Sequence, residues 1–214
     1  MILSFILEFK RCTKQLDIAI LIESSGSIGE KNYIKQKTFV KNFAGAFRIS
    51  EQWTRVGIIV YSDRAFVAKR FNENFEHEYL SGIINDLPFR KGTGNINNAL
   101  RLAADNLLTT KTGMREGVPR IVIVITDGRH NMSHHQAYQL RGATEHLVSV
   151  GARIFVVGVG QEVNENSLAL ISGNRENVMV SRSFDHLPKQ EIRLARMSCK
   201  AEGMLRIGKS FRKL

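Results

Sequence analysis

The feature that most constrains the fold of this chain is the alternation of continuous apolar runs with helical patterns. The run LDIAILIE, residues 16–23, is apolar almost throughout, whereas a strand with one face in water would alternate apolar and polar residues. RIVIVITDG, residues 120–128, has the same character and also predicts a buried strand. Buried strands separated by helices require a mostly parallel sheet covered on both faces, so the sequence predicts an α/β fold.

Helical periodicity is clear in KNYIKQKTFVKNFAGAF, residues 31–47, where apolar residues recur at three- and four-residue spacings and lysines take the other face. The same reading predicts further helices and two more strands along the rest of the chain. The helices are expected at residues 76–87, 95–108, 133–150, 165–173 and 186–199, and the strands at residues 152–160 and 177–182.

Two adjacent segments, TRVGIIVYS at residues 54–62 and RAFVAKRF at residues 64–71, predict strands close enough in sequence to form a hairpin. The second segment alternates apolar and polar residues and carries Arg64, Lys69 and Arg70. Charged side chains protect an exposed strand edge from pairing with other chains. We therefore expect the second strand to lie at the edge of the sheet.

The length of 214 residues and the hydrophobic content of 43% are those of one ordinary globular domain. We expect an N-terminal stub at residues 1–14, a folded domain at 15–200 and a basic C-terminal tail at 201–214. No apolar run approaches the ~20 residues that a membrane helix needs. The opening MILSFILEF lacks the basic start, long apolar core and cleavage site of a secretory signal, so we expect it to be the stub of a larger or incomplete chain.

The net charge of +11 is unevenly spread, because residues 175–214 hold ten basic and four acidic side chains. Arg193, Arg196 and Lys200 would share one face of the last helix or its continuation. A solvated helix face is the simplest interpretation. The sharper hypothesis is a basic patch that meets a heparin-like polysaccharide, and we expect neither nucleic-acid binding nor membrane insertion.

The chain has two cysteines, Cys12 and Cys199, which bracket nearly the whole globular sequence. A disulfide between them would indicate an oxidising compartment. The alternative is two unrelated thiols in a cytosolic protein, and the cysteine count alone does not decide between the two.

Polar turns follow two of the predicted strands, ESSGS after the first and TDG after the strand at residues 120–126. Ligands of an open α/β sheet bind at the carboxyl ends of the strands, so Ser25, Ser27 and Asp127 are expected to converge there. Oxygen ligands of this kind suit Mg²⁺, Mn²⁺ or Ca²⁺ rather than zinc. An acid, Glu23, ends the first strand just before these hydroxyls.

The order of these motifs resembles the von Willebrand factor type A domain. The resemblance rests on acid-x-Ser-x-Ser-Ile-Gly after the first strand, a glycine-rich turn before the AL at residues 99–100, and ITDG at residues 125–128, and it runs from about residue 16 to about residue 200. It implies a three-layer Rossmann-like fold with a central, mostly parallel, six-stranded sheet, one antiparallel edge strand and helices on both faces. It also implies a metal-ion-dependent adhesion site. Many extracellular members close their two ends with a disulfide, so the resemblance favours a Cys12–Cys199 bond.

The match to the metal site of that family is incomplete. Ser25, Ser27 and Asp127 match, but the family's first acid is an aspartate and this chain has Glu23. The family's metal-binding threonine lies five residues before the Ala of AL, which is Gly94 here, and Thr93 would substitute only if the loop shifted by one residue. We expect the turn to keep its shape and to bind Mg²⁺ or Mn²⁺ weakly or not at all, the alternative being rescue by Thr93, waters or a carboxylate of a partner.

The sequence also holds a glycosylation sequon at Asn131, which would carry glycan only if the protein is secreted. We expect a non-enzymatic, extracellular adhesion or matrix module whose partners are collagen-like or other matrix proteins. The alternative is an intracellular domain of the same family that acts as a scaffold in a larger assembly. An enzyme would need a nucleotide or phosphate site, and no GxxxxGK[ST] loop is present.

Overall fold

The computed structural model describes residues 11–129, 132–201, 204–207 and 210–213. A six-stranded sheet forms its centre, in the spatial order β3-β2-β1-β4-β5-β6. The strands are β1 (Leu16–Glu23), β2 (Thr54–Tyr61), β3 (Ala65–Lys69), β4 (Arg120–Thr126), β5 (Ala152–Val159) and β6 (Val178–Ser181). All neighbouring strands run parallel except the β2–β3 pair, which is antiparallel and places β3 at the edge.

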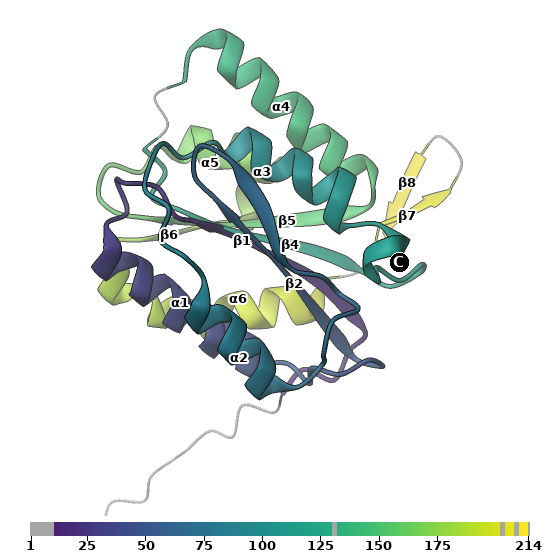
Figure 1. The fold of residues 1–214 in the computed structure, drawn as a ribbon. Helices are drawn as coiled ribbons and strands as arrows, with labels where there is room; N and C mark the ends of the chain where they lie inside the picture. The colour runs from purple at the N-terminus through teal and green to yellow at the C-terminus, as the bar shows by residue number, and fades with distance from the viewer. Residues whose placement is uncertain (1–10, 130–131, 202–203, 208–209, 214) are drawn as a thin grey trace, which may run out of the picture.

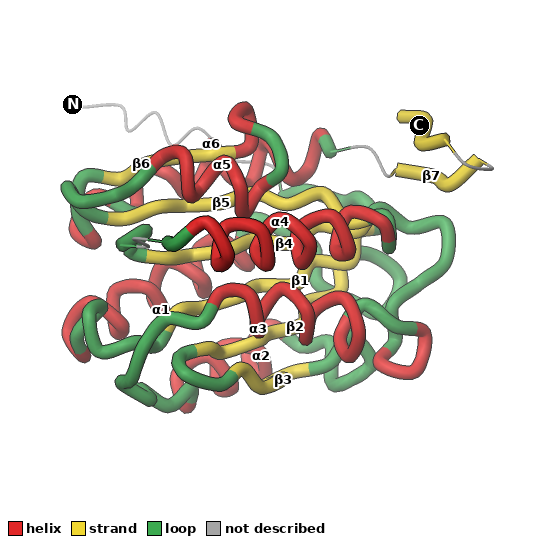
Figure 2. The backbone as a smooth tube through the Cα atoms, turned by 90° about the horizontal axis from the view of Figure 1, so that it is seen from above, coloured by secondary structure: helices red, strands yellow, loops and turns green. Residues whose placement is uncertain are grey.

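Helices cover both faces of the sheet, as Figures 1 and 2 show. One face carries α1 (Glu30–Gly45), α2 (His77–Asp86) and α6 (Pro188–Lys200). The other carries α3 (Ile96–Leu102), α4 (His134–Ser149) and α5 (Glu165–Ser172). The predicted three-layer fold with its antiparallel edge strand is therefore confirmed. No helix within the described ranges is both long enough and apolar enough to span a bilayer.

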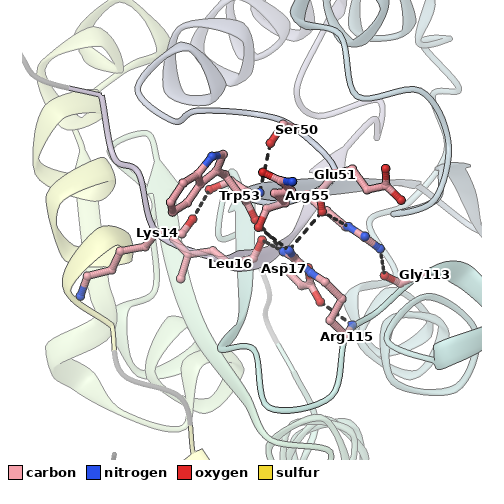
Figure 3. A network of polar contacts seen from close by, with 11 residues as sticks. Lys14, Leu16, Asp17, Ser50, Glu51, Trp53, Arg55, Gly113 and Arg115 are labelled. Carbon is pink, nitrogen blue, oxygen red and sulfur yellow. Dashed lines mark hydrogen bonds and ion pairs between the residues drawn. The ribbon is translucent and has the colours of Figure 1, made fainter.

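The core is divided by the sheet into two apolar layers, because the side chains of each strand alternate between its faces. Every residue of β1 is buried, as its almost continuous apolar run predicted. Two of these residues, Asp17 and Glu23, are acids. The carboxylate of Asp17, at the amino end of β1, is held by the guanidinium of Arg115 at 2.7 Å. Figure 3 shows that this guanidinium also faces the backbone of the loop before β2.

Lys69 departs from its expected role at the strand edge. Arg64 and Arg70 are exposed, but Lys69 is buried and its Nζ donates to the carbonyls of Val56, Arg70 and Glu73. The pairing of β2 with β3 shifts register between Ile58 and Ile59, and such a bulge changes the face on which following side chains lie. Burial lowers the pKa of Lys69 to about 8. The prediction that Lys69 guards the edge was therefore wrong.

Two further segments differ from the sequence reading. The helix expected at residues 95–108 is α-helical only to Leu102 and continues as a π-helical turn, Ala103–Leu107. The tail, for which no structure was predicted, contains two short antiparallel strands, β7 (Met204–Ile207) and β8 (Ser210–Lys213).

A disulfide joins the two ends of the domain, because Cys12 bonds Cys199 in the last turn of α6. The two Cα atoms are 6.0 Å apart and 187 positions apart in sequence. Cys12 precedes β1 and pairs with the segment after α1, where its N–H donates to Ala46. The bond therefore lies near the amino end of β1, at the opposite end of that strand from Glu23.

Candidate functional site

The polar residues selected from the sequence gather at the carboxyl ends of β1 and β4. These strands are parallel neighbours, and their register pairs Ile22 with Ile125, so the turns that follow them leave the sheet side by side. Ser25, Ser27 and Asp127 therefore converge with Glu23, as expected from the topology. Glu23, Ser25 and Asp127 are buried and Ser27 is exposed.

A chain of hydrogen bonds runs through the turn after β1. The hydroxyls of Ser27 and Ser25 are 3.0 Å apart, and the Ser25 hydroxyl donates to Oε1 of Glu23 at 2.7 Å. The other carboxylate oxygen, Oε2, accepts from the backbone N–H of Asp127 at 3.3 Å. Thr126 adds a side-chain hydrogen bond to the same carboxylate. The carboxylate of Glu23 therefore accepts hydrogen bonds from the turn after β1 and from the end of β4.

The environment of Glu23 disfavours its charge. Burial, followed by repulsion from the nearby carboxylate of Asp127, raises the pKa of Glu23 to about 7. Tyr61, fully buried beside it on β2, has its own pKa raised well above the usual value, mainly by burial. The strand ends therefore hold two carboxylates in a poorly solvated setting.

Asp127 is only partly satisfied by hydrogen bonds. Its Oδ1 accepts from the backbone N–H of Arg129 at 3.2 Å, while its buried Oδ2 has no hydrogen-bond partner. The guanidinium Nε of Arg129 lies 3.9 Å from Oδ2 and 3.3 Å from the carboxylate of Glu162. Because the Arg129 side chain is half exposed, it places a positive charge on this face of the molecule.

The loop before α3 contains the two positions at which the sequence departs from the family pattern. Gly94 lies directly beside Glu23, since a Cβ atom at position 94 would overlap Oε1 and lie 3.0 Å from Cδ of that side chain. Thr93 is held by Asp63, whose Oδ1 accepts from its N–H at 2.7 Å and from its hydroxyl at 2.6 Å. The hydroxyl that would have to replace the missing ligand therefore already has a partner.

Sequence reasoning missed Ser24 and Asp63, which join the loops of this face. The Ser24 hydroxyl donates to the carbonyl of Pro88 and accepts from the N–H of Arg90. The Gly26 N–H donates to the carbonyl of Gly92 at 2.8 Å. Asp63 lies in the SDR turn of the predicted hairpin, and its position next to a strand end was the available signal.

A hollow of about 770 Å³ opens beside the turn, between α3 and α4. Its walls are rich in side-chain carboxamides and also include Ser27 and Arg129. The carboxamides are those of Asn95, Asn97, Asn98, Gln136 and Gln139. Such a surface can donate and accept hydrogen bonds, which suits the polar groups of a protein partner.

The residues at the strand ends do not fit a divalent cation in the arrangement seen. Both oxygens of Glu23 accept from protein donors, and the carboxylate fills the space beside Gly94 from which a further side-chain ligand would come. Within the described residues, no group of three or more His, Cys, Asp or Glu side chains gathers closely enough to hold a metal ion. The expected ligand set therefore exists as a cluster, with its first acid turned to internal hydrogen bonds.

The predicted basic patch lies elsewhere, and the predicted glycosylation site is not described. Arg193, Arg196 and Lys200 are all exposed on α6, on the far face of the sheet from α4. Asn131, the sequon residue, falls outside the described residues.

Comparisons with known proteins agree with this architecture. A family model described as the von Willebrand factor type A domain matches residues 17–192. The human von Willebrand factor A domain-containing protein 2 is 28% identical over 167 residues, which cover 78% of this chain and 21% of that protein. The human collagen alpha-5(VI) chain is 29% identical over 192 residues, covering 89% of this chain and 7% of that one. This chain therefore spans only a small part of these curated relatives.

Among solved structures, the fold is similar to that of proximal thread matrix protein 1 from the mussel byssus, in a form with a zinc-occupied MIDAS motif. The TM-score is 0.79 at 24% identity, covering 88% of this chain and 49% of the other. At that identity the likeness supports the fold and does not transfer the metal.

Proposed function

The chain belongs to the von Willebrand factor type A domain family, and from this premise we propose that it is a non-enzymatic, extracellular protein-binding module of the matrix or adhesion type. The observation that carries the proposal is the disulfide between Cys12 and Cys199. Disulfides persist in oxidising compartments and are rare in the cytosol. The bond therefore favours the extracellular alternative over an intracellular scaffold, as does the likeness to collagen VI chains.

The face at the carboxyl ends of the strands is the docking surface that we propose. It combines the hollow between α3 and α4 with the half-exposed guanidinium of Arg129. Collagen-like and other matrix proteins present backbone carbonyls and acidic side chains that match such donors. The exposed basic residues of α6 form a second candidate surface, which suits a heparin-like polysaccharide.

Surface plasmon resonance over fibrillar collagen, heparin and albumin tests both surfaces. Asn98→Arg places a long side chain in the hollow without touching α6, and the triple variant Arg193→Ser, Arg196→Ser, Lys200→Ser leaves the hollow intact. We expect Asn98→Arg to weaken collagen binding and the triple variant to weaken heparin binding only. Binding that neither variant changes, or no binding beyond that to albumin, would contradict the proposed surfaces.

A further inference from the structure

The two departures from the family pattern, Glu23 and Gly94, touch each other in the structure. A side chain at position 94 would overlap Oε1 of Glu23. The backbone of Gly94 does not require glycine, because its φ lies outside the left-handed region in which glycine is favoured. Space alone therefore excludes a side chain there, and the longer side chain of Glu23 takes that space. The two residues thus form a reciprocal pair, although 71 positions separate them.

The carboxylate of Glu23 holds separate loops together, as a bound cation does in an ion site. A divalent cation holds separate loops together by collecting their oxygen atoms. Here Glu23 receives the hydroxyl of Ser25 at 2.7 Å and the N–H of Asp127 at 3.3 Å, so it bonds the turn after β1 directly to the end of β4. It is 1% exposed, which leaves it no contact with a partner.

The loop before α3 is fixed by protein groups as well. It is bonded to the turn after β1 through the Gly26–Gly92 hydrogen bond and through Ser24, which meets Pro88 and Arg90. Thr93 is bonded to Asp63, in the turn between β2 and β3, through its backbone N–H at 2.7 Å and its hydroxyl at 2.6 Å. All three segments of the face are therefore positioned by internal hydrogen bonds.

We propose that Glu23 and Gly94 together replace the divalent cation of this face, so that the domain presents a preformed docking surface that works without metal. The inference rests on the proposed function only for the statement that this face meets a partner.

The first experiment is a double-mutant cycle on the pair. Wild type, Glu23→Asp, Gly94→Thr and the double variant are compared by calorimetric titration of Mn²⁺ and by thermal unfolding in EDTA and in 5 mM Mn²⁺. Wild type is expected to give no Mn²⁺ heat and the same melting temperature in both buffers. The double variant combines the shorter acid with a hydroxyl at position 94, and we expect it to bind Mn²⁺ with a Kd of about 1 mM or tighter. Adding Ser25→Ala should abolish that binding.

A matched pair of small substitutions separates the steric effect from general loop damage. Gly94→Ala adds a Cβ atom that overlaps Glu23, whereas at Gly26 the added Cβ would meet only Gly92 at an ordinary 3.5 Å. Gly94→Ala is expected to lower the melting temperature by about 4–10 °C, and Gly26→Ala by about 2 °C or less. In the Glu23→Asp background, the loss caused by Gly94→Ala should shrink.

Three results would overturn the proposal. One is Mn²⁺ binding by wild type that Ser25→Ala removes, and another is a Gly94→Ala variant as stable as wild type. The third is a folded double variant that binds no Mn²⁺, because other residues would then be keeping the ion out. None of these measurements uses a partner, so a failure to bind collagen or heparin would count against the proposed function alone.

Discussion

Replacing Arg115 with methionine is the sharpest test of how the base of the domain is held. The carboxylate of Asp17 is fully buried, and Arg115 donates three hydrogen bonds to it, from its backbone N–H, Nε and Nη2 at 2.7, 3.0 and 2.7 Å. The guanidinium also donates to four backbone carbonyls in two segments (Figure 3). These are the carbonyls of Leu16, Glu51, Gln52 and Trp53.

Removing the guanidinium leaves a buried charge without its partner. Breaking a buried ion pair from one side costs about 3–5 kcal/mol, whereas replacing both partners by apolar groups is often close to neutral. We therefore expect Arg115→Met to lower the free energy of unfolding by about 3–5 kcal/mol. The double variant Asp17→Leu, Arg115→Met should lose less than Arg115→Met alone, although it removes more polar contacts.

Urea unfolding followed by circular dichroism at pH 7 measures both losses. With a slope of about 2.5 kcal/mol per molar urea, Arg115→Met should move the midpoint down by about 1.2–2 M. Arg115→Lys is the matched control, since it keeps the charge but cannot reach the carboxylate and the carbonyls together. A loss below about 1 kcal/mol for Arg115→Met, or a double variant less stable than Arg115→Met, would refute this reasoning.

Other predictions concern the disulfide, the buried acid and the buried lysine. The double variant Cys12→Ser, Cys199→Ser removes the cross-link between residues 187 positions apart, and in the chain-entropy model this lowers the free energy of unfolding by about 5 kcal/mol. In calorimetry, adding reductant should lower the melting temperature of wild type to that of the variant and leave the variant unchanged. The pKa of Glu23 is raised to about 7 from 4.5, so the stability that its protonated form confers is complete below pH 4.5 and is lost as the pH rises through 7. Urea midpoints from pH 4.5 to 8 should fall less steeply for Glu23→Gln than for wild type. Lys69→Met should destabilise the domain by about 1–3 kcal/mol, because three carbonyls lose their donor, while Arg70→Met, at an exposed neighbour, should change little in the same urea assay.

The layers of this fold could be predicted because their signals are local. The almost continuous apolar run at residues 16–23 identifies a buried strand, and the spacing of apolar residues in 31–47 identifies a helix, without knowledge of distant contacts. Lys69 was assigned to the wrong face because the bulge that reorients it depends on pairing with β2, which sequence alternation does not reveal.

The residues of the candidate site could be predicted from the sequence, but the contacts between them could not. Glu23 and Gly94 were each recognised as departures, and each was taken as a separate weakening of the site. Their contact depends on how two loops meet across the end of the sheet, which no local pattern encodes. The hold of Asp63 on Thr93 was missed for the same reason.

The cystine described above determines how tension would pass through the domain. If the chain is pulled from its two sides, force enters at Cys12 and leaves at Cys199, and the path between them is a pair of sulfur atoms. The strands and helices between these positions lie off that path and carry no tension. The distance between the two points of pull is then limited by Cα atoms 6.0 Å apart, so the fold between the two cysteines keeps its shape while the chain on either side of it is stretched.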